Sequence, residues 1–145
     1  MVEVRAPNAV ERLFNSLIGA LVRMGIGKPK MRVLEVRGRK SGKTYSLPVD
    51  LLELGGRTYL VAPRGHTQWA QNAEAAGVVT LRRGSRSAQF RLRTLSPPEK
   101  PPVLKAYLDE FESEVGRFFP VPAGSPPEAF AAIAERYPAF ELTPQ

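Results

Sequence analysis

The stretch RGRKSGKTYSLPVDLLELGGRTYLVAPRG, residues 37–65, decides the fold. Two turn signals, Ser41-Gly42 and Gly55-Gly56, separate segments rich in apolar and β-branched residues, a pattern typical of strands joined by tight turns. Strands joined by such short turns pair antiparallel. Pro48 lies inside the second segment and has no backbone N–H to donate, so we expect it at a sheet edge or at a bulge.

The same pattern continues on the C-terminal side of this stretch. In its last segment Ala88, Phe90 and Leu92 alternate with polar residues, which indicates a strand with one buried face. The predicted strands are residues 31–38, 44–54, 57–63, 78–83 and 87–95, and a short helix at 67–75 interrupts them. Five or six strands with this spacing favour a small β-barrel.

Apolar residues recur every three to four positions near both ends of the chain, which predicts amphipathic helices there. One such helix covers residues 8–25. In the last third, one apolar stripe predicts a helix that begins near Pro101. A second stripe, which contains Tyr137, predicts a helix with Ser125 as its cap and Pro126 at its first position.

Together these elements predict an α+β fold, a small, mainly antiparallel β-barrel with an N-terminal helix and C-terminal helices. We expect one domain over residues 1–145, in which the N-terminal helix (1–29), the barrel core (30–95) and a helical C-terminal part (96–145) follow one another. A loop at 113–124 and a final strand at 139–143 complete the prediction.

The composition excludes several kinds of active site. The chain has no cysteine and only one histidine, His66, which excludes disulfides, cysteine nucleophiles and histidine-rich metal sites, and no metal is expected. The motifs G-x-S-x-G, G-x-x-x-x-G-K-[ST] and G-x-G-x-x-G are absent, which leaves little support for a hydrolase or a kinase. A redox enzyme needs few reactive side chains, because its cofactor carries the chemistry. We see no signal peptide or bilayer-spanning stretch and expect a cytoplasmic protein.

Positive charge is concentrated in the first two thirds of the chain. The net charge is +7, with 17 Lys and Arg against 6 Asp and Glu in residues 1–97, and 4 against 8 in residues 98–145. This asymmetry favours an anionic partner: a phosphate-bearing cofactor, an acidic lipid surface or nucleic acid. Aromatic stacking platforms are not evident, which argues against nucleic acid. From charge alone, a basic face that keeps the protein in solution explains the pattern as well.

The strongest local feature is a basic turn, Gly38-Arg39-Lys40-Ser41-Gly42-Lys43, between two predicted strands. Successive backbone N–H groups in a glycine-containing turn can form a concavity that binds an anion. The basic side chains and the Ser41 hydroxyl add further donors, so the turn is a candidate phosphate cradle. Taken alone, it fits an ordinary hairpin turn with solubilising charges equally well.

The order of these motifs resembles the deazaflavin-dependent nitroreductase family. The resemblance covers roughly residues 30–143, and its elements are G-R-K-S-G at 38–42, Pro48, Gly55-Gly56, Val61-Ala62 and W-x-x-N at Trp69 and Asn72. It implies a split β-barrel and, as cofactor, coenzyme F-420, an 8-hydroxy-5-deazaflavin with a phosphate and a glutamate tail. It also implies an oxidoreductase that passes a hydride from the reduced cofactor to a quinone, a nitroaromatic compound or an enone.

By position, the resemblance implies that the basic turn holds the phosphate and that residues 61–64 present backbone groups to the ring. It also implies that Gln68, Trp69 and Asn72 close the pocket. The implied cofactor-binding residues are Arg39, Lys40, Ser41, Gly42, Lys43, Tyr45, Pro48, Val61, Ala62, Pro63, Arg64, Gln68, Trp69 and Asn72. The candidate proton donors are Tyr137, by the resemblance, and His66, as a side chain that exchanges protons near neutral pH. The family often has arginine at the position of Tyr45.

Several alternatives stay open at this point. FMN is the second choice of cofactor. The same fold could also serve as a non-catalytic binding protein that carries FMN, haem or a fatty acid. A homodimer and a peripheral membrane contact are likewise left open.

Overall fold

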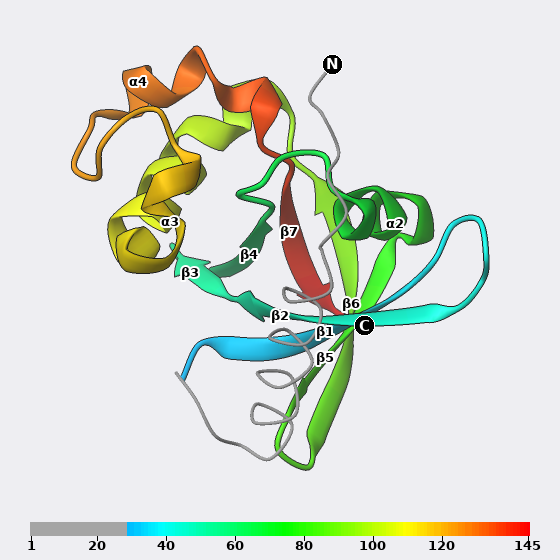
Figure 1. Ribbon diagram of the computed structural model, residues 1–145. Helices are drawn as coiled ribbons and strands as arrows, with labels where there is room; N and C mark the ends of the chain where they lie inside the picture. The colour runs from blue at the N-terminus through cyan, green and yellow to red at the C-terminus, as the bar shows by residue number, and fades with distance from the viewer. Residues whose placement is uncertain (1–28) are drawn as a thin grey trace.

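A computed structural model describes residues 29–145, which form a curled seven-stranded sheet with helices packed against it (Figure 1). Across the sheet the strand order is β2-β1-β5-β6-β7-β4-β3, and every neighbouring pair is antiparallel. The predicted α+β fold with a mainly antiparallel half-barrel is therefore confirmed. The strands are β1 Met31–Arg37, β2 Thr44–Asp50, β3 Leu52–Leu54, β4 Arg57–Val61, β5 Val78–Arg83, β6 Arg86–Thr94 and β7 Ala139–Pro144.

The two edge strands of the sheet, β2 and β3, follow each other directly in the chain. Only Leu51 separates them, and its N–H donates to the carbonyl of Lys30 at 2.9 Å instead of to a strand partner. The prediction of one strand over 44–54 is thus wrong at this residue. Pro48 lies opposite Val33 in edge strand β2, which confirms its predicted edge position. An edge strand has a partner on one side only and therefore accommodates a residue without an N–H.

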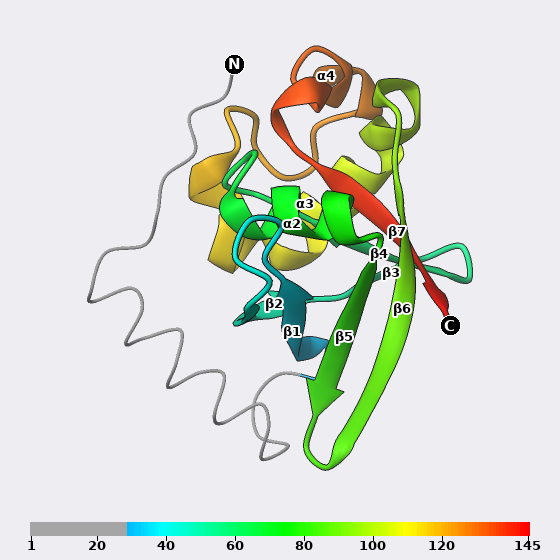
Figure 2. The same cartoon turned by 90° about the vertical axis from the view of Figure 1, so that its right-hand side faces the viewer.

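The helices form two groups. Helix α2 (Gln68–Ala76), predicted at 67–75, packs against β1, β5 and β6, and the C-terminal helices cover β3, β4 and β7 (Figures 1 and 2). The C-terminal elements are η1 Pro97–Glu99, α3 Lys100–Val115, η2 Gly116–Phe118, α4 Pro127–Ala131 and η3 Ala134–Arg136. Because α3 and η2 extend to residue 118, the predicted loop at 113–124 is wrong in its first half. The predicted final strand is confirmed as β7.

Helix α3 begins at Lys100, next to Pro101, which confirms the predicted start, and the short 3-10 turn η1 precedes it. Ser96 and Glu99 form a capping box, in which the Glu99 carboxylate accepts from the Ser96 N–H at 2.9 Å and the glutamate N–H meets the serine side chain. Arg93 on β6 donates to the same carboxylate at 3.0 Å. These bonds, that from Arg93 first, lower the pKa of Glu99 to about 2. The box therefore stabilises the turn η1, from which α3 continues.

Helix α4 begins one residue later than predicted. Its N-cap is Pro126 and its first helical residue is Pro127. The hydroxyl of Ser125, the predicted cap, instead donates to the carbonyl of Pro122 at 2.6 Å in the preceding turn. Two consecutive prolines both satisfy the rule that the first helical residue needs no N–H, so the sequence did not distinguish the two starts.

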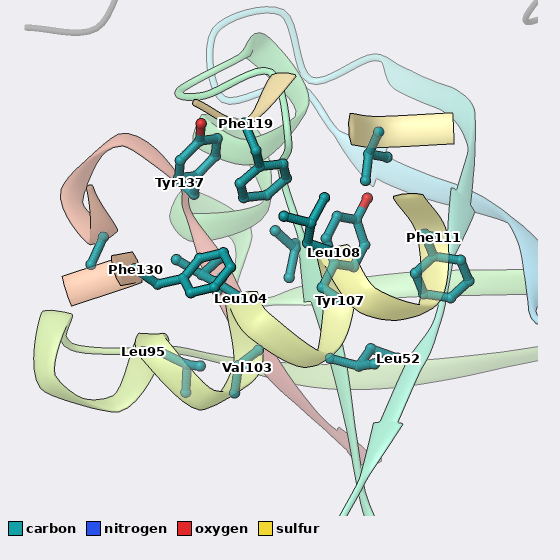
Figure 3. Close-up of a cluster of buried hydrophobic side chains, with 14 residues drawn as sticks. Leu52, Leu95, Val103, Leu104, Tyr107, Leu108, Phe111, Phe119, Phe130 and Tyr137 are labelled. Atoms are coloured by element: carbon teal, nitrogen blue, oxygen red, sulfur yellow. The ribbon is translucent and has the colours of Figure 1, made fainter. Parts of the chain in front are cut away.

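Two hydrophobic clusters hold the sheet and the helices together. The barrel core lies between the sheet and α2 and includes Leu34, Leu60, Ala73 and Phe140. The C-terminal core lies between α3, α4 and the β3–β4 side of the sheet and is rich in aromatic rings (Figure 3). The residues labelled there, among them Tyr107, Phe119, Phe130 and Tyr137, are at most 9% exposed.

Three further predictions concern the buried face of β6, the N-terminal helix and membrane-spanning segments. Phe90 and Leu92 pack against the barrel core as predicted, but Ala88 is exposed, because it lies toward the tip of the β5–β6 hairpin, which projects beyond the helices (Figure 2). The predicted helix at 8–25 lies outside the described residues. Within residues 29–145, no helix is both long and apolar enough to cross a membrane.

Candidate functional site

The basic turn between β1 and β2 has a single, well-defined backbone path. The N–H of Gly38 donates to the carbonyl of Lys43 at 2.7 Å, and the N–H of Gly42 donates to the carbonyl of Gly38 at 3.0 Å. Gly42 has a φ of 72°, a backbone conformation that residues other than glycine adopt only with steric strain. A Cβ at Gly38 would lie 2.6 Å from the Tyr45 ring. The two glycines therefore allow the turn to close and Tyr45 to lie flat upon it.

The turn presents a set of hydrogen-bond donors to solvent. Among the described residues, none accepts a hydrogen bond from the N–H of Lys40 or of Ser41. The hydroxyls of Ser41 and Tyr45 lie 3.1 Å apart, and the N–H of Lys43 donates to the Ser41 hydroxyl at 3.1 Å. The side chains of Lys40 and Lys43 are exposed and form no ion pair with a described carboxylate. This arrangement fits an anionic group such as a phosphate.

Arg39, in contrast, is directed away from solvent onto helix α2. Its guanidinium donates to Asn72 Oδ1 at 2.7 Å, to Gln68 Oε1 at 3.0 Å and to Gln71 Oε1 at 3.2 Å. Its backbone N–H also donates to Asn72 Oδ1, at 3.1 Å. Asn72 is buried, with 6% of its surface exposed. Four hydrogen bonds from one residue thus fasten the turn to the helix, and three of the predicted site residues are brought together as structural partners.

We expect this connection to be measurable as an energetic coupling between Arg39 and Asn72. In a double-mutant cycle with Arg39→Ala and Asn72→Ala, the free energies of unfolding should deviate from additivity by about 1 kcal/mol or more, because the two residues share hydrogen bonds. Chemical denaturation of the four proteins measures it. The matched cycle with Lys40→Ala and Asn72→Ala should be additive, since the exposed Lys40 side chain forms no described hydrogen bond or ion pair with α2. An additive Arg39–Asn72 cycle would contradict the contact.

Trp69 lies on the inner side of α2. Its ring centroid is 6.1 Å from that of Phe140 on β7, and the side chain is partly buried against the barrel core. Its neighbours Gln68 and Asn72 bind Arg39, so the W-x-x-N segment joins the core, the helix and the turn. Gln71, which was not predicted, adds to this junction. It lies one helical turn beyond Gln68 on the same face, and that spacing was a signal that could have identified it.

The loop between β4 and α2, residues 62–67, is held on both sides. The N–H of Ala62 donates to the carbonyl of Pro138 at 2.9 Å, and the His66 carbonyl accepts from Gln71 Nε2 at 2.9 Å. Val61 and Ala62 are buried, Pro63 is partly buried and Arg64 is exposed. Figure 2 shows this loop, in dark green, on the same side of the sheet as the β1–β2 turn. The turn, α2 and this loop thus form one continuous region, called here the turn–loop surface.

The two candidate proton donors both donate to main-chain carbonyls. His66 Nε2 lies 2.9 Å from the Glu135 carbonyl, which can only accept, so this nitrogen carries the hydrogen. The Tyr137 hydroxyl donates to the Phe118 carbonyl at 2.6 Å, and its ring stacks on that of Phe119 at 4.4 Å (Figure 3). Burial raises the pKa of Tyr137. His66 therefore joins the loop to the C-terminal part, and Tyr137 joins two segments within that part. Proton donation by either side chain stays a prediction.

The chain is similar to proteins of known type. Residues 3–115 match the model of a family described as F420H2-dependent quinone reductase. An F420-H2-dependent reductase, FDR-A, has a similar structure, with 19% identity, a TM-score of 0.54, and coverage of 81% of this chain and 97% of that one. A structure described as a domain-swapped dimer is 18% identical, with a TM-score of 0.54 and coverage of 92% of this chain and 96% of that one. The heme storage protein HutZ from Vibrio cholerae is 9% identical, with a TM-score of 0.54 and coverage of 81% of this chain and 83% of that one. A comparison with curated protein sequences gave no match.

Proposed function

The chain belongs to the F420H2-dependent quinone reductase family and is a coenzyme F-420-dependent oxidoreductase, and on this basis we propose that the turn–loop surface binds the cofactor and that a quinone is the acceptor. The observation that carries the proposal is the donor set of the β1–β2 turn. Two backbone N–H groups, two hydroxyls and two lysines point to solvent without an anionic partner among the described residues. A cofactor with a phosphate and carboxylates supplies the charge that this turn lacks.

The residues of the turn divide into two roles in this proposal. Lys40, Ser41, Lys43 and Tyr45 face solvent and contact the anionic tail. Arg39 contributes its four hydrogen bonds to α2 and acts as a positioning residue that keeps the turn in its binding shape. Tyr45 is 47% exposed, and its hydroxyl replaces the charged contact of family members that have arginine there with a neutral donor.

The loop at 62–67 is proposed to lie beside the cofactor ring. When bound, the reduced deazaflavin supplies a hydride, that is two electrons and one proton, and a quinone needs one further proton to become a hydroquinone. Pro63 and Arg64 present main-chain groups at this point, while buried Val61 and Ala62 give the loop a rigid, water-free base. Such residues contribute by positioning reactants and excluding water.

Titration of the purified protein with coenzyme F-420 tests the proposal. Trp69 is the only tryptophan, and its fluorescence reports on α2 next to the turn, so we expect saturable quenching with micromolar affinity and weaker binding of FMN. Reduced cofactor should then be oxidised when 2-methyl-1,4-naphthoquinone is added. If neither F-420 binding nor quinone reduction is observed, or if haem or FMN binds more tightly, the assignment to this site fails.

A homodimer, a peripheral membrane contact and a cytoplasmic location stay predictions. Light scattering of the purified protein, which measures its molar mass in solution, tests the homodimer first. The family assignment supports a small-molecule redox substrate as the partner of this chain.

A further inference from the structure

Three arginines gather around two aromatic rings beside the loop at 62–67. The Arg117 guanidinium carbon lies 4.8 Å from the centroid of the Phe118 ring, and that of Arg64 lies 5.8 Å from the same ring. The Arg136 guanidinium carbon lies 5.7 Å from the Tyr137 ring. The Tyr137 hydroxyl donates to the Phe118 carbonyl at 2.6 Å, which joins the two rings. These five residues are called the arginine–aromatic cluster.

Two of these arginines lie in the part of the chain that carries a net negative charge. Residues 98–145 contain only 4 basic residues against 8 acidic ones, yet two of the 4, Arg117 and Arg136, lie in this cluster. Both are exposed, and neither forms an ion pair with a described carboxylate. Burial lowers the pKa of Lys100, and the carboxylate of Glu135, the acidic neighbour of Arg136 in sequence, acts against that shift. The positive charges of Arg117 and Arg136 are therefore available to a ligand.

Guanidinium groups stacked on aromatic faces are held in place while their N–H edges point outward. Such an arrangement recognises a carboxylate, sulfonate or phosphate. Arg64 belongs to the loop at 62–67, and His66 of the same loop bonds to Glu135, the neighbour of Arg136. The cluster thus borders the place where the proposed function puts the cofactor ring, on the side of the C-terminal elements.

We propose that the arginine–aromatic cluster is an acceptor subsite that selects quinones carrying an anionic substituent. This inference rests on the proposed function and adds the chemical class of the acceptor. Reduction of such a quinone takes one hydride from the cofactor and one proton from water to give the hydroquinone, and the anionic group is unchanged. The guanidiniums bind that group and do not take part in electron transfer.

A matched pair of acceptors tests the subsite: 2-methyl-1,4-naphthoquinone with a 3-propanoate side chain, and the methyl ester of the same compound. The pair shares its redox centre and differs in one negative charge. For the wild-type protein we expect a lower KM for the acid. In the double variant Arg117→Gln and Arg136→Gln, the KM of the acid should rise about tenfold, and that of the ester should not change, because only the acid carries the charge that the two guanidiniums contact.

Binding measured without turnover separates this inference from the proposed function. Equilibrium dialysis of the acid against the protein, with and without coenzyme F-420, should show affinity that falls in the double variant and with added salt. A control variant, Arg86→Gln with Arg91→Gln, removes the same charge from exposed positions on β6 and should behave as wild type. Equal effects on acid and ester, or equal effects of both double variants, overturn the subsite. Weaker F-420 binding in the Arg117/Arg136 variant, with the acid unaffected, would assign the cluster to the cofactor's glutamate tail and likewise overturn it.

Discussion

Replacing Lys40 and Lys43 together with alanine is expected to weaken coenzyme F-420 binding about 100-fold, because two charge-assisted contacts of about 1.5 kcal/mol each are lost. Both side chains extend from the β1–β2 turn into solvent, and no described carboxylate pairs with them. The turn itself should stay folded, since its shape depends on Gly38, Gly42 and the bonds of Arg39. The loss should therefore appear in the dissociation constant and not in the unfolding free energy.

Fluorescence titration at several salt concentrations measures this effect. The affinity of the wild-type protein should decrease as salt is added, and that of the variant should depend on salt less steeply, because fewer charges remain to be screened. Arg86→Ala with Arg91→Ala is the control, because it removes two positive charges from exposed positions on β6. If this control loses affinity as strongly as the turn variant, net charge and not the turn determines binding.

Replacing Phe140 with alanine is expected to destabilise the protein by about 3–5 kcal/mol, the usual cost of removing a buried phenylalanine ring. Phe140 is fully buried on β7, opposite Leu60 on β4 and Thr94 on β6, so its ring fills the centre of the barrel core. It also supports Trp69, whose ring is 6.1 Å away. The cavity left by the ring would thus loosen the contact between the sheet and α2.

Urea denaturation followed by circular dichroism measures the loss as a lower midpoint with little change in slope. The folded variant should also show altered Trp69 fluorescence, since the ring next to the indole is gone. Leu54→Ala on edge strand β3 is the control; the leucine is 36% exposed, and a substitution there should cost about 0.5 kcal/mol or less. A loss for Phe140→Ala as small as that of the control would contradict the described core.

Local sequence patterns predicted most of the secondary structure correctly. The glycine turns and the alternation of apolar residues located six of the seven strands, and Pro48 correctly indicated an edge. The errors occurred where a contact distant in sequence decides the outcome. Arg93 on β6 stabilises the Ser96–Glu99 box of the turn η1, which was not predicted, and the N–H of Leu51 donates to the carbonyl of Lys30 where the predicted strand is interrupted. Neither partner could be identified from the residues next to it.

The sequence by itself determined the antiparallel α+β fold, the basic turn and the family, because these depend on the order and spacing of residue types along the chain. Only the tertiary structure decided what individual side chains do. Arg39 and Lys40 are adjacent basic residues, and the sequence predicts phosphate binding equally for both. In the structure the Arg39 guanidinium donates hydrogen bonds to Asn72, Gln68 and Gln71, whereas the Lys40 side chain faces solvent. A hydrogen bond depends on the direction and distance of its partner, and folding brings residue 39 next to residue 72, which no local pattern specifies.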